Sequence, residues 1–243
     1  MNFRKIKQEE ESKYLEIRRP LGEKILSFME DVHYKTKKRI NSYQSVYAWD
    51  NWSIFDIDNK EYFAMHDYLF SHILYDDILE KASIAYPKHF NTSNPEDVLT
   101  AINLTRGRKI VNMGEWLRQT SYIAVTDMSM KKVLKIGLFR NIDKIEFSSG
   151  FLHCLKHFKG KNNQYLTSIT NSKKKFYNQP ELPSTLILCI TDCLFNGAPK
   201  SIIPFNDDYT YVYDYVMGGK TFEVHFYYST KFDVYMFSTI HRI

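Results

Sequence analysis

The sequence has few cysteines and no long apolar run. Three cysteines are an odd number for a chain of 243 residues, and the N-terminal stretch MNFRKIKQEEESK lacks the apolar segment of a secretory signal. A disulfide framework is therefore not expected, and a reducing cytoplasm is the predicted compartment. No stretch approaches 18 consecutive apolar residues, so no membrane-spanning helix is expected.

Motifs that identify several large enzyme classes are also missing. The chain contains no phosphate-binding loop of the G-x-x-x-x-G-K-S/T type, no G-x-G-x-x-G fingerprint and no G-x-S-x-G elbow. These absences argue against P-loop nucleotide hydrolases, dinucleotide-dependent enzymes and serine hydrolases. Gly218-Gly219-Lys220 is interpreted as a turn, and no cofactor is expected.

Aromatic residues and positive charge are plentiful. The 18 tyrosines and 17 phenylalanines suit sheet surfaces, and 44% hydrophobic residues suffice for a packed core. Residues 130 to 177 carry eleven basic and two acidic side chains, a net charge of +9 in a chain whose total is +5. Such a segment attracts phosphate and polyanions, although a solvated lysine-rich loop explains residues 173 to 175 equally well.

Residues 1 to 120 have a mostly helical pattern. Pro20 suits a first helical turn, and the apolar side chains that follow it form one stripe: Leu21, Ile25, Phe28, Met29 and Val32. A second helix is predicted from about residue 65 to 85, and a third opens at Asn94. Residues 48 to 62 lack a helical period and are interpreted as a short hairpin or a loop.

Residues 121 to 243 have a different character. Strands are predicted at 121–127 and 131–139, and a meander of three strands at 209–216, 221–228 and 233–243. Periodicity does not assign the apolar run 182–197. The predicted fold class is α+β, with a helical N-terminal domain (1–120) followed by an α+β domain with an antiparallel meander (121–243).

A first candidate site lies in SSGFLHCLKHFKGK, residues 148 to 161. On a helix, Phe151, Cys154, Leu155 and Phe158 would share one face, and His153, Lys156 and His157 the other. Imidazoles beside a fixed positive charge suit proton transfer at a phosphodiester, and an ordinary solvated face is the alternative. A zinc ion held by the two histidines with Cys189 and Cys193 is a third interpretation.

A second candidate site lies in the terminal hairpin, where the register decides which side chains meet. If Tyr228 pairs with Val234, then four polar residues share one face: Glu223, His225, Thr239 and His241. If the register slips by one residue, Glu223 and His225 join Ser238 and Arg242, and His241 moves to the other face. A polar surface without chemistry is again the alternative.

The last two sites together resemble a known group of ribonucleases. A basic helix with histidine, followed by YVMGGKTFEVHFYY and VYMFSTIHRI, resembles the barnase, EndoU, colicin and RelE superfamily (the BECR fold) over residues 130 to 243. The segment SSGFLHCLKHF is also similar to the G-F-x-H stretch of EndoU-type enzymes, with a shorter spacing to the second histidine.

This resemblance implies metal-independent cleavage of RNA by attack of the 2′-hydroxyl. His153 or His157 would act as the base, and His241 or His225 as the acid, with Thr239 orienting the phosphate. The phosphate-binding residues would be Lys156, Lys159, Lys220 and Arg242. The implied partners are RNA, with tRNA as one candidate class, and a cognate inhibitor protein; no membrane is involved.

A function of another class is the alternative. A non-catalytic module that binds nucleic acid or protein in a phage defence or counter-defence system would keep the basic surface and need no paired histidines. In either case the tyrosines of strand 209–216 could stack on unpaired bases.

Overall fold

A computed structural model describes the helices and strands that frame the molecule. The described residues are 4–35, 51–66, 122–138, 183–217 and 219–243, with the single residues 70, 71, 74, 81, 85, 86, 100, 104, 150, 151 and 154. Side chains are not described at 30–35, 183–184, 217 and 242. Within these ranges, no helix is both long and apolar enough to cross a bilayer.

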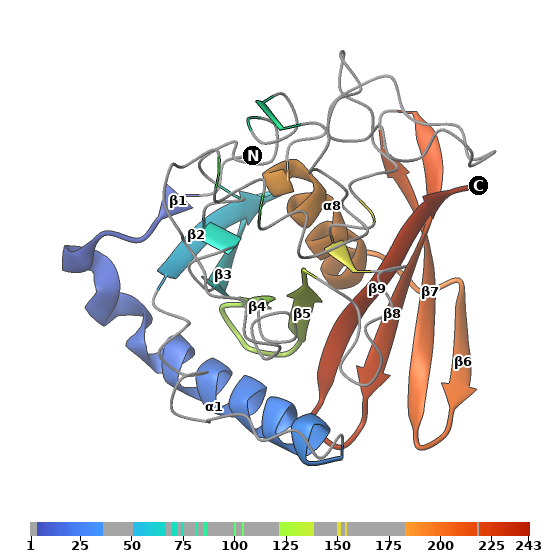
Figure 1. Cartoon of the computed structure of the whole chain (residues 1–243), viewed down its shortest axis with the longest axis horizontal. Coiled ribbons are helices and arrows are strands. Elements are labelled where there is room, and N and C mark those ends of the chain that lie inside the picture. The colour runs from blue at the N-terminus through green and yellow to red at the C-terminus, as the bar shows by residue number, and fades with distance from the viewer. Residues whose placement is uncertain are drawn as a thin grey trace.

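The described strands form one mixed sheet (Figure 1). Nine strands lie in the order β1-β2-β3-β4-β5-β9-β8-β7-β6, and every pair is antiparallel except β5 with β9. Their bounds are β1 Arg4–Lys5, β2 Asn51–Ile57, β3 Lys60–His66, β4 Tyr122–Asp127, β5 Val133–Gly137, β6 Ser201–Phe205, β7 Asp208–Met217, β8 Lys220–Ser229 and β9 Val234–Arg242. The α+β class is confirmed at this coarse level.

The N-terminal part contributes more strand than predicted. A 3-10 turn, η1 (Gln8–Glu10), leads into helix α1 (Glu11–Lys35), but β1, β2 and β3 also precede residue 120. β3 continues through His66, where a second helix was expected to begin, and it pairs with β4. The division near residue 120 stays a prediction, and the two sides of it share one sheet.

The hairpin of β2 and β3 has a clear local cause. Asp58 and Asn59 form a two-residue turn between Ile57 and Lys60, with φ angles of 48° and 63°. Positive φ at both turn positions matches the twist of the flanking strands, and Asp and Asn tolerate it better than most residues. Of the two interpretations of residues 48 to 62, this confirms the hairpin for residues 51 to 62, and residues 48 to 50 lie outside the described residues.

Each face of the sheet packs against one described helix. Helix α8 (Pro183–Asn196) packs on one face through Leu186, Ile190 and Leu194, in a core that includes Phe222, Val224, Phe226 and Ile240. Helix α1 packs on the opposite face through Leu21, Ile25, Phe28 and Met29, against residues that include Tyr122, Val133 and Val234. Figure 1 shows the sheet curving around α8, with α1 outside it.

Helix α1 begins earlier than predicted. Its first residue is Glu11, so Pro20 lies inside the helix and not in its first turn. The apolar stripe is nevertheless correct in phase, because Leu21, Ile25 and Phe28 are all buried. Burial of that stripe compensates for the backbone hydrogen bond that an internal proline removes.

Helix α8 resolves the run 182–197 that periodicity left unassigned. Gly197 follows its last residue, and the N–H of Gly197 donates to the carbonyl of Cys193 over 3.2 Å. A Cβ atom at Gly197 would lie 2.4 Å from the same carbonyl oxygen, so a larger residue would force this end of the helix to move. The tight end lets the chain turn directly towards β6.

Candidate functional site

The register of β8 with β9 decides which side chains meet, and a β-bulge sets it. Near the turn, Tyr228 pairs with Tyr235 and Phe226 with Phe237, which is the slipped register. Ser238 is then an extra residue, so His225 pairs with Thr239 and Glu223 with His241. Bulges redirect side chains in this way. Neither of the two registers considered for the sequence gives this pairing of the polar residues. Glu223, His225 and His241 nevertheless lie on one face of the hairpin.

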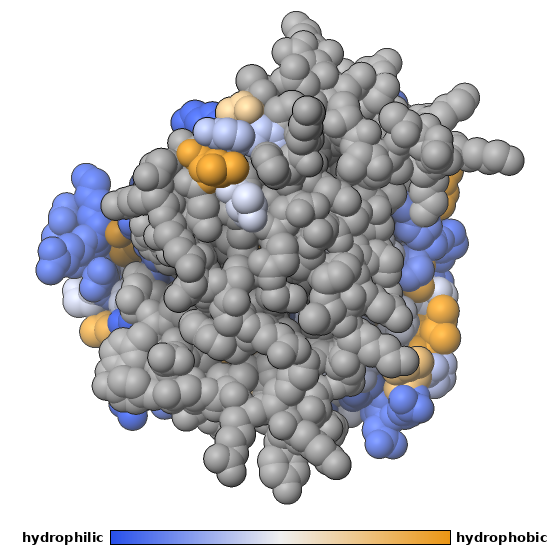
Figure 2. Space-filling view, in the orientation of Figure 1, coloured by the Kyte–Doolittle hydropathy of each residue, from blue (hydrophilic) through white to orange (hydrophobic). Residues whose placement is uncertain are grey.

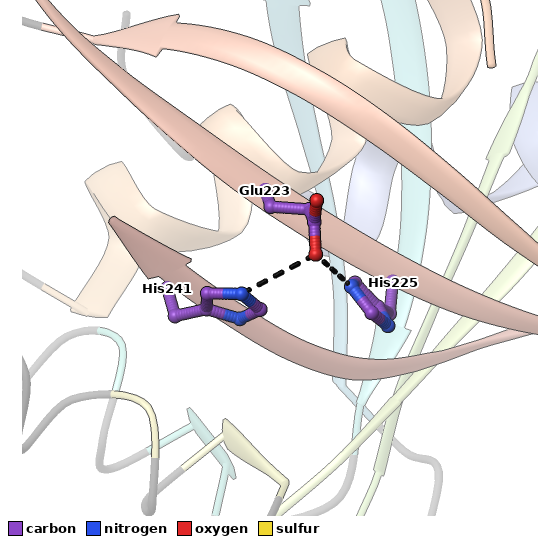
Figure 3. A group of neighbouring side chains, drawn as sticks. All are labelled: Glu223, His225 and His241. Carbon is purple, nitrogen blue, oxygen red and sulfur yellow. Dashed lines mark hydrogen bonds and ion pairs between the residues drawn. The ribbon is translucent and has the colours of Figure 1, made fainter. Parts of the chain in front are cut away.

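These three side chains form one compact cluster, which we call the Glu223 cluster (Figure 3). Glu223 and His225 are alternate residues of β8, and His241 lies opposite Glu223 on β9. Glu223 Oε1 lies 2.7 Å from His225 Nε2 and 3.3 Å from His241 Nε2. The two imidazole centroids are 5.4 Å apart. One carboxylate oxygen thus lies between two imidazoles.

The cluster lies on the face of β8 opposite α8 and is partly open to solvent. The side chains of Glu223, His225 and His241 are 22%, 27% and 27% exposed. A hydrogen bond from His225 is the main reason that the pKa of Glu223 lies below its usual value. An ionised carboxylate only accepts hydrogen bonds, so His225 donates from Nε2 to Glu223 Oε1, and Nδ1 is the other nitrogen of the same ring.

A lysine that the sequence analysis missed lies beside the cluster. Lys200 Nζ lies 3.5 Å from Glu223 Oε2 and 3.1 Å from Asp214 Oδ1. Asp214 pairs with Glu223 across β7 and β8, so a row of polar side chains crosses three strands. Lys200 precedes β6, outside any strand pattern, and only the long-range pairing of β6 with β7 brings it here.

The remaining predicted residues of the hairpin lie nearby. Thr239 pairs with His225, but its Oγ1 atom is 3.9 Å from Cys154 Sγ. Lys220 is the first residue of β8, and Arg242 pairs with Phe222 at the end of β9. The side chain of Arg242 lies outside the described residues.

The other candidate site falls mostly outside the described residues, which omit His153, Lys156, His157 and Lys159. Its segment nevertheless begins next to β9. The N–H of Gly150 donates to the carbonyl of Ser238 over 3.4 Å, and Phe151 and Cys154 are fully buried. The burial of these two residues agrees with the apolar face predicted for this segment.

The zinc interpretation that used Cys189 and Cys193 loses support from the described cysteine positions. Cys193 is buried in the α8 core, and burial raises the pKa of its thiol. A zinc ligand must be a thiolate, which an apolar site disfavours. No disulfide joins the three cysteines, all of which belong to the described residues.

Base stacking by the tyrosines of β7 is contradicted at one position at least. Tyr213 is buried in the α8 core, where its ring packs edge-on against Phe226. Tyr215 is partly buried and donates its hydroxyl to Asp192 of α8. These rings hold β7 to the helix, and Tyr209 is the most exposed of the strand's tyrosines.

Comparisons with protein-family models, with curated proteins and with solved structures found no match to this chain.

Proposed function

We propose that the chain is an endoribonuclease of the cytoplasm that cleaves RNA without a metal ion, with the Glu223 cluster as its reaction site. One observation carries the proposal: two imidazoles on neighbouring strands share one carboxylate in a partly exposed position. Cleavage by the 2′-hydroxyl needs one group that accepts a proton and another that donates one. Two imidazoles on one face of a sheet supply both.

The geometry suggests a division of roles. Glu223 orients His225 through Nε2, as a carboxylate orients a catalytic imidazole, so His225 Nδ1 takes the proton of the 2′-hydroxyl. The 2′-oxygen forms a bond to phosphorus and the bond to the 5′-oxygen breaks. His241 protonates the leaving 5′-oxygen. The products are a 2′,3′-cyclic phosphate and a 5′-hydroxyl.

Cations near the cluster would stabilise the charged phosphate. Lys200 is the candidate that lies within 3.5 Å of Glu223. Lys220 and Arg242, on the hairpin of β8 and β9, remain candidates from the sequence. His153, His157, Lys156 and Lys159 stay predictions: the described residues of their segment, Phe151 and Cys154, pack in the α8 core, on the face of the sheet away from the Glu223 cluster. The resemblance to BECR-fold toxins leads to the further expectation of a cognate inhibitor protein.

The test is cleavage of a labelled RNA oligonucleotide in the presence of a chelator. The wild-type protein is expected to leave a cyclic phosphate end, and RNA with 2′-O-methyl groups is expected to stay intact. His225→Ala and His241→Ala should each reduce the rate by about 10²- to 10⁴-fold. Ile202→Ala, an exposed strand residue at the sheet edge, is the control that should retain full activity. RNA that stays intact with the wild-type protein would sink the proposal.

A binding module without catalysis is the second candidate, and β6 is the observation that favours it. All five residues of this edge strand are exposed, and Ile202, Ile203 and Phe205 are 49%, 52% and 55% exposed. Figure 2 shows apolar atoms at the edge of the molecule where Figure 1 places β6. Exposed apolar edges are typical of protein interfaces. Wild-type protein that binds RNA or a protein but never cuts RNA would support this candidate.

A further inference from the structure

The Glu223 cluster has the geometry of a metal site. One ligand atom from each of Glu223, His225 and His241 lies within 4.8 Å of the other two. Two ligands that bind a tetrahedral ion at 2.0–2.1 Å lie about 3.4 Å apart. The distances of 2.7 Å and 3.3 Å from Glu223 Oε1 to the two Nε2 atoms are close to that value. Small side-chain rotations would open the space for an ion.

The chemical nature of these atoms selects the metal. Two imidazole nitrogens and one carboxylate oxygen suit zinc and other divalent transition metals, whereas magnesium and calcium prefer sites made of oxygen alone. We infer that Glu223, His225 and His241 bind a zinc ion, with solvent completing its coordination. This site differs from the Cys189 and Cys193 interpretation and uses neither cysteine.

The backbone holds the three ligands in place. Glu223 and His225 are fixed by alternation on β8, and the pairing with β9 fixes His241 opposite Glu223. Lys200 lies against Oε2 of the carboxylate, so Oε1 is the oxygen that faces both imidazoles. A neighbour that occupies one carboxylate oxygen orients the other as a single ligand atom.

Zinc would act as an inhibitor of the site, and this consequence depends on the function proposed above. A neutral imidazole that binds a metal through Nε2 carries its proton on Nδ1. His225 would then be unable to accept the 2′-hydroxyl proton, and Glu223 would no longer orient it. Bound zinc would therefore prevent His225 from acting as the base and His241 from acting as the acid. Metal occupancy would switch RNA cleavage off.

Binding is tested on full-length protein from which metals have been removed, with zinc chloride as the probe. Isothermal titration should show one zinc ion per chain, and Glu223→Gln, His225→Ala and His241→Ala should each weaken binding at least about tenfold. Cys189→Ser is the matched control and should bind normally. Circular dichroism checks that each variant is folded. Binding that survives His241→Ala but is lost in Cys189→Ser would overturn the inference, as would the absence of saturable binding.

Cobalt provides a second readout that does not depend on activity. Cobalt(II) in a site of two imidazoles and one carboxylate shows visible d–d bands without the charge-transfer band that a thiolate ligand adds. Such a spectrum, lost in His225→Ala, supports the inference. A thiolate band would assign the metal to cysteine and overturn it.

Activity separates the metal site from the proposed function. Chelated protein that cleaves RNA, and loses activity in proportion to bound zinc, supports both. Chelated protein that cleaves RNA but never binds zinc keeps the function and sinks the metal site. Stoichiometric zinc on a protein that never cleaves RNA keeps the metal site and sinks both the function and the inhibition. Zinc-dependent cleavage would overturn the inhibition, because the ion would then take part in the reaction.

Discussion

On one face of the sheet, ionisable side chains are buried in one region and partly exposed to solvent in another. Lys135 on β5 pairs with Met236 of β9, which pairs in turn with Tyr227, so Lys135 shares its face with the Glu223 cluster. Helix α1 covers Lys135, and only 3% of the surface of this residue is exposed. By contrast, about a quarter of each side chain of the Glu223 cluster is exposed. The same face therefore has a closed end and an open end.

The closed end makes a charge costly. Lys135 Nζ lies 3.6 Å from the ring centroid of Tyr122 and 4.8 Å from that of Phe28, and 3.9 Å from Met236 Sδ. Ring faces favour an ammonium group only modestly, and none of these described partners is an anion. Burial lowers the pKa of Lys135 from 10.5 to about 7. The comparison indicates that α1 sets the protonation of a side chain by excluding water.

Opening the closed end should have the largest effect on stability. Phe28→Ala removes a buried ring between α1 and Lys135 and is expected to reduce the free energy of unfolding by about 3–5 kcal/mol. Urea denaturation at neutral pH measures the change. Leu15→Ala is the matched control on the same helix, because Leu15 is half exposed, and its effect should be far smaller. Equal losses from the two variants would mean that α1 does not seal this end.

Removing the buried charge should raise stability. Between pH 7 and 10.5 the unfolded chain binds more protons at Lys135 than the folded chain, so wild-type stability rises with pH by up to about 1.4 kcal/mol per unit. Below pH 7 both states are protonated and this slope disappears. Lys135→Met should be a few kcal/mol more stable at pH 7, at roughly 1.4 kcal/mol for each pKa unit of the shift, and its advantage should shrink as pH rises.

Urea denaturation at pH 7, 8 and 9 measures this slope for the wild type and for Lys135→Met. Lys231→Met changes an exposed lysine and should keep the wild-type slope. A difference between Lys135→Met and wild type that stays constant over this pH range would show that Lys135 is protonated in the folded protein, as in water.

A change at the open end should affect stability least. Glu223→Gln alters a partly exposed ion pair and is expected to shift the free energy of unfolding by less than about 1 kcal/mol. The same change should remove any rise in melting temperature that zinc gives the wild type, because ligands stabilise only the state that binds them. Thermal unfolding with and without zinc measures both effects. A large loss of stability without zinc would assign Glu223 a structural role.

Local patterns in the sequence predicted much of the fold. The apolar stripe from Leu21 to Met29 predicted the buried face of α1, and Gly219, with φ of 72°, confirms the turn between β7 and β8. Long-range pairing was not predictable. Nothing near residue 135 signals the parallel contact of β5 with β9, and nothing near Lys200 signals its distance of 3.5 Å from Glu223. Such contacts depend on segments far apart in the chain.

The sequence predicted which residues belong to the candidate site. It did not predict which residue of β9 pairs with which residue of β8. Alternation placed Glu223 and His225 on one face, because a strand has a period of two residues. The face of His241 depends on Ser238, and the stretch VYMFSTIHRI has no glycine or proline to mark a bulge there. Sequence reasoning therefore left two registers open. The slipped register matches the pairing near the turn, and the other register matches only the face that Glu223, His225 and His241 share.

The last prediction concerns the bulge at Ser238, whose deletion should change zinc affinity least. Deleting Ser238 removes the extra residue but keeps the alternation, so Thr239 should still pair with His225, and His241 with Glu223. Zinc affinity should stay within a few-fold of wild type, at a stability cost of about 1 kcal/mol for the lost contact with Gly150. An alanine inserted after Thr239 should instead turn His241 to the α8 face and abolish binding. If the deletion abolishes zinc binding as fully as the insertion does, then the shape of the bulge, and not the alternation of the strand, positions His241.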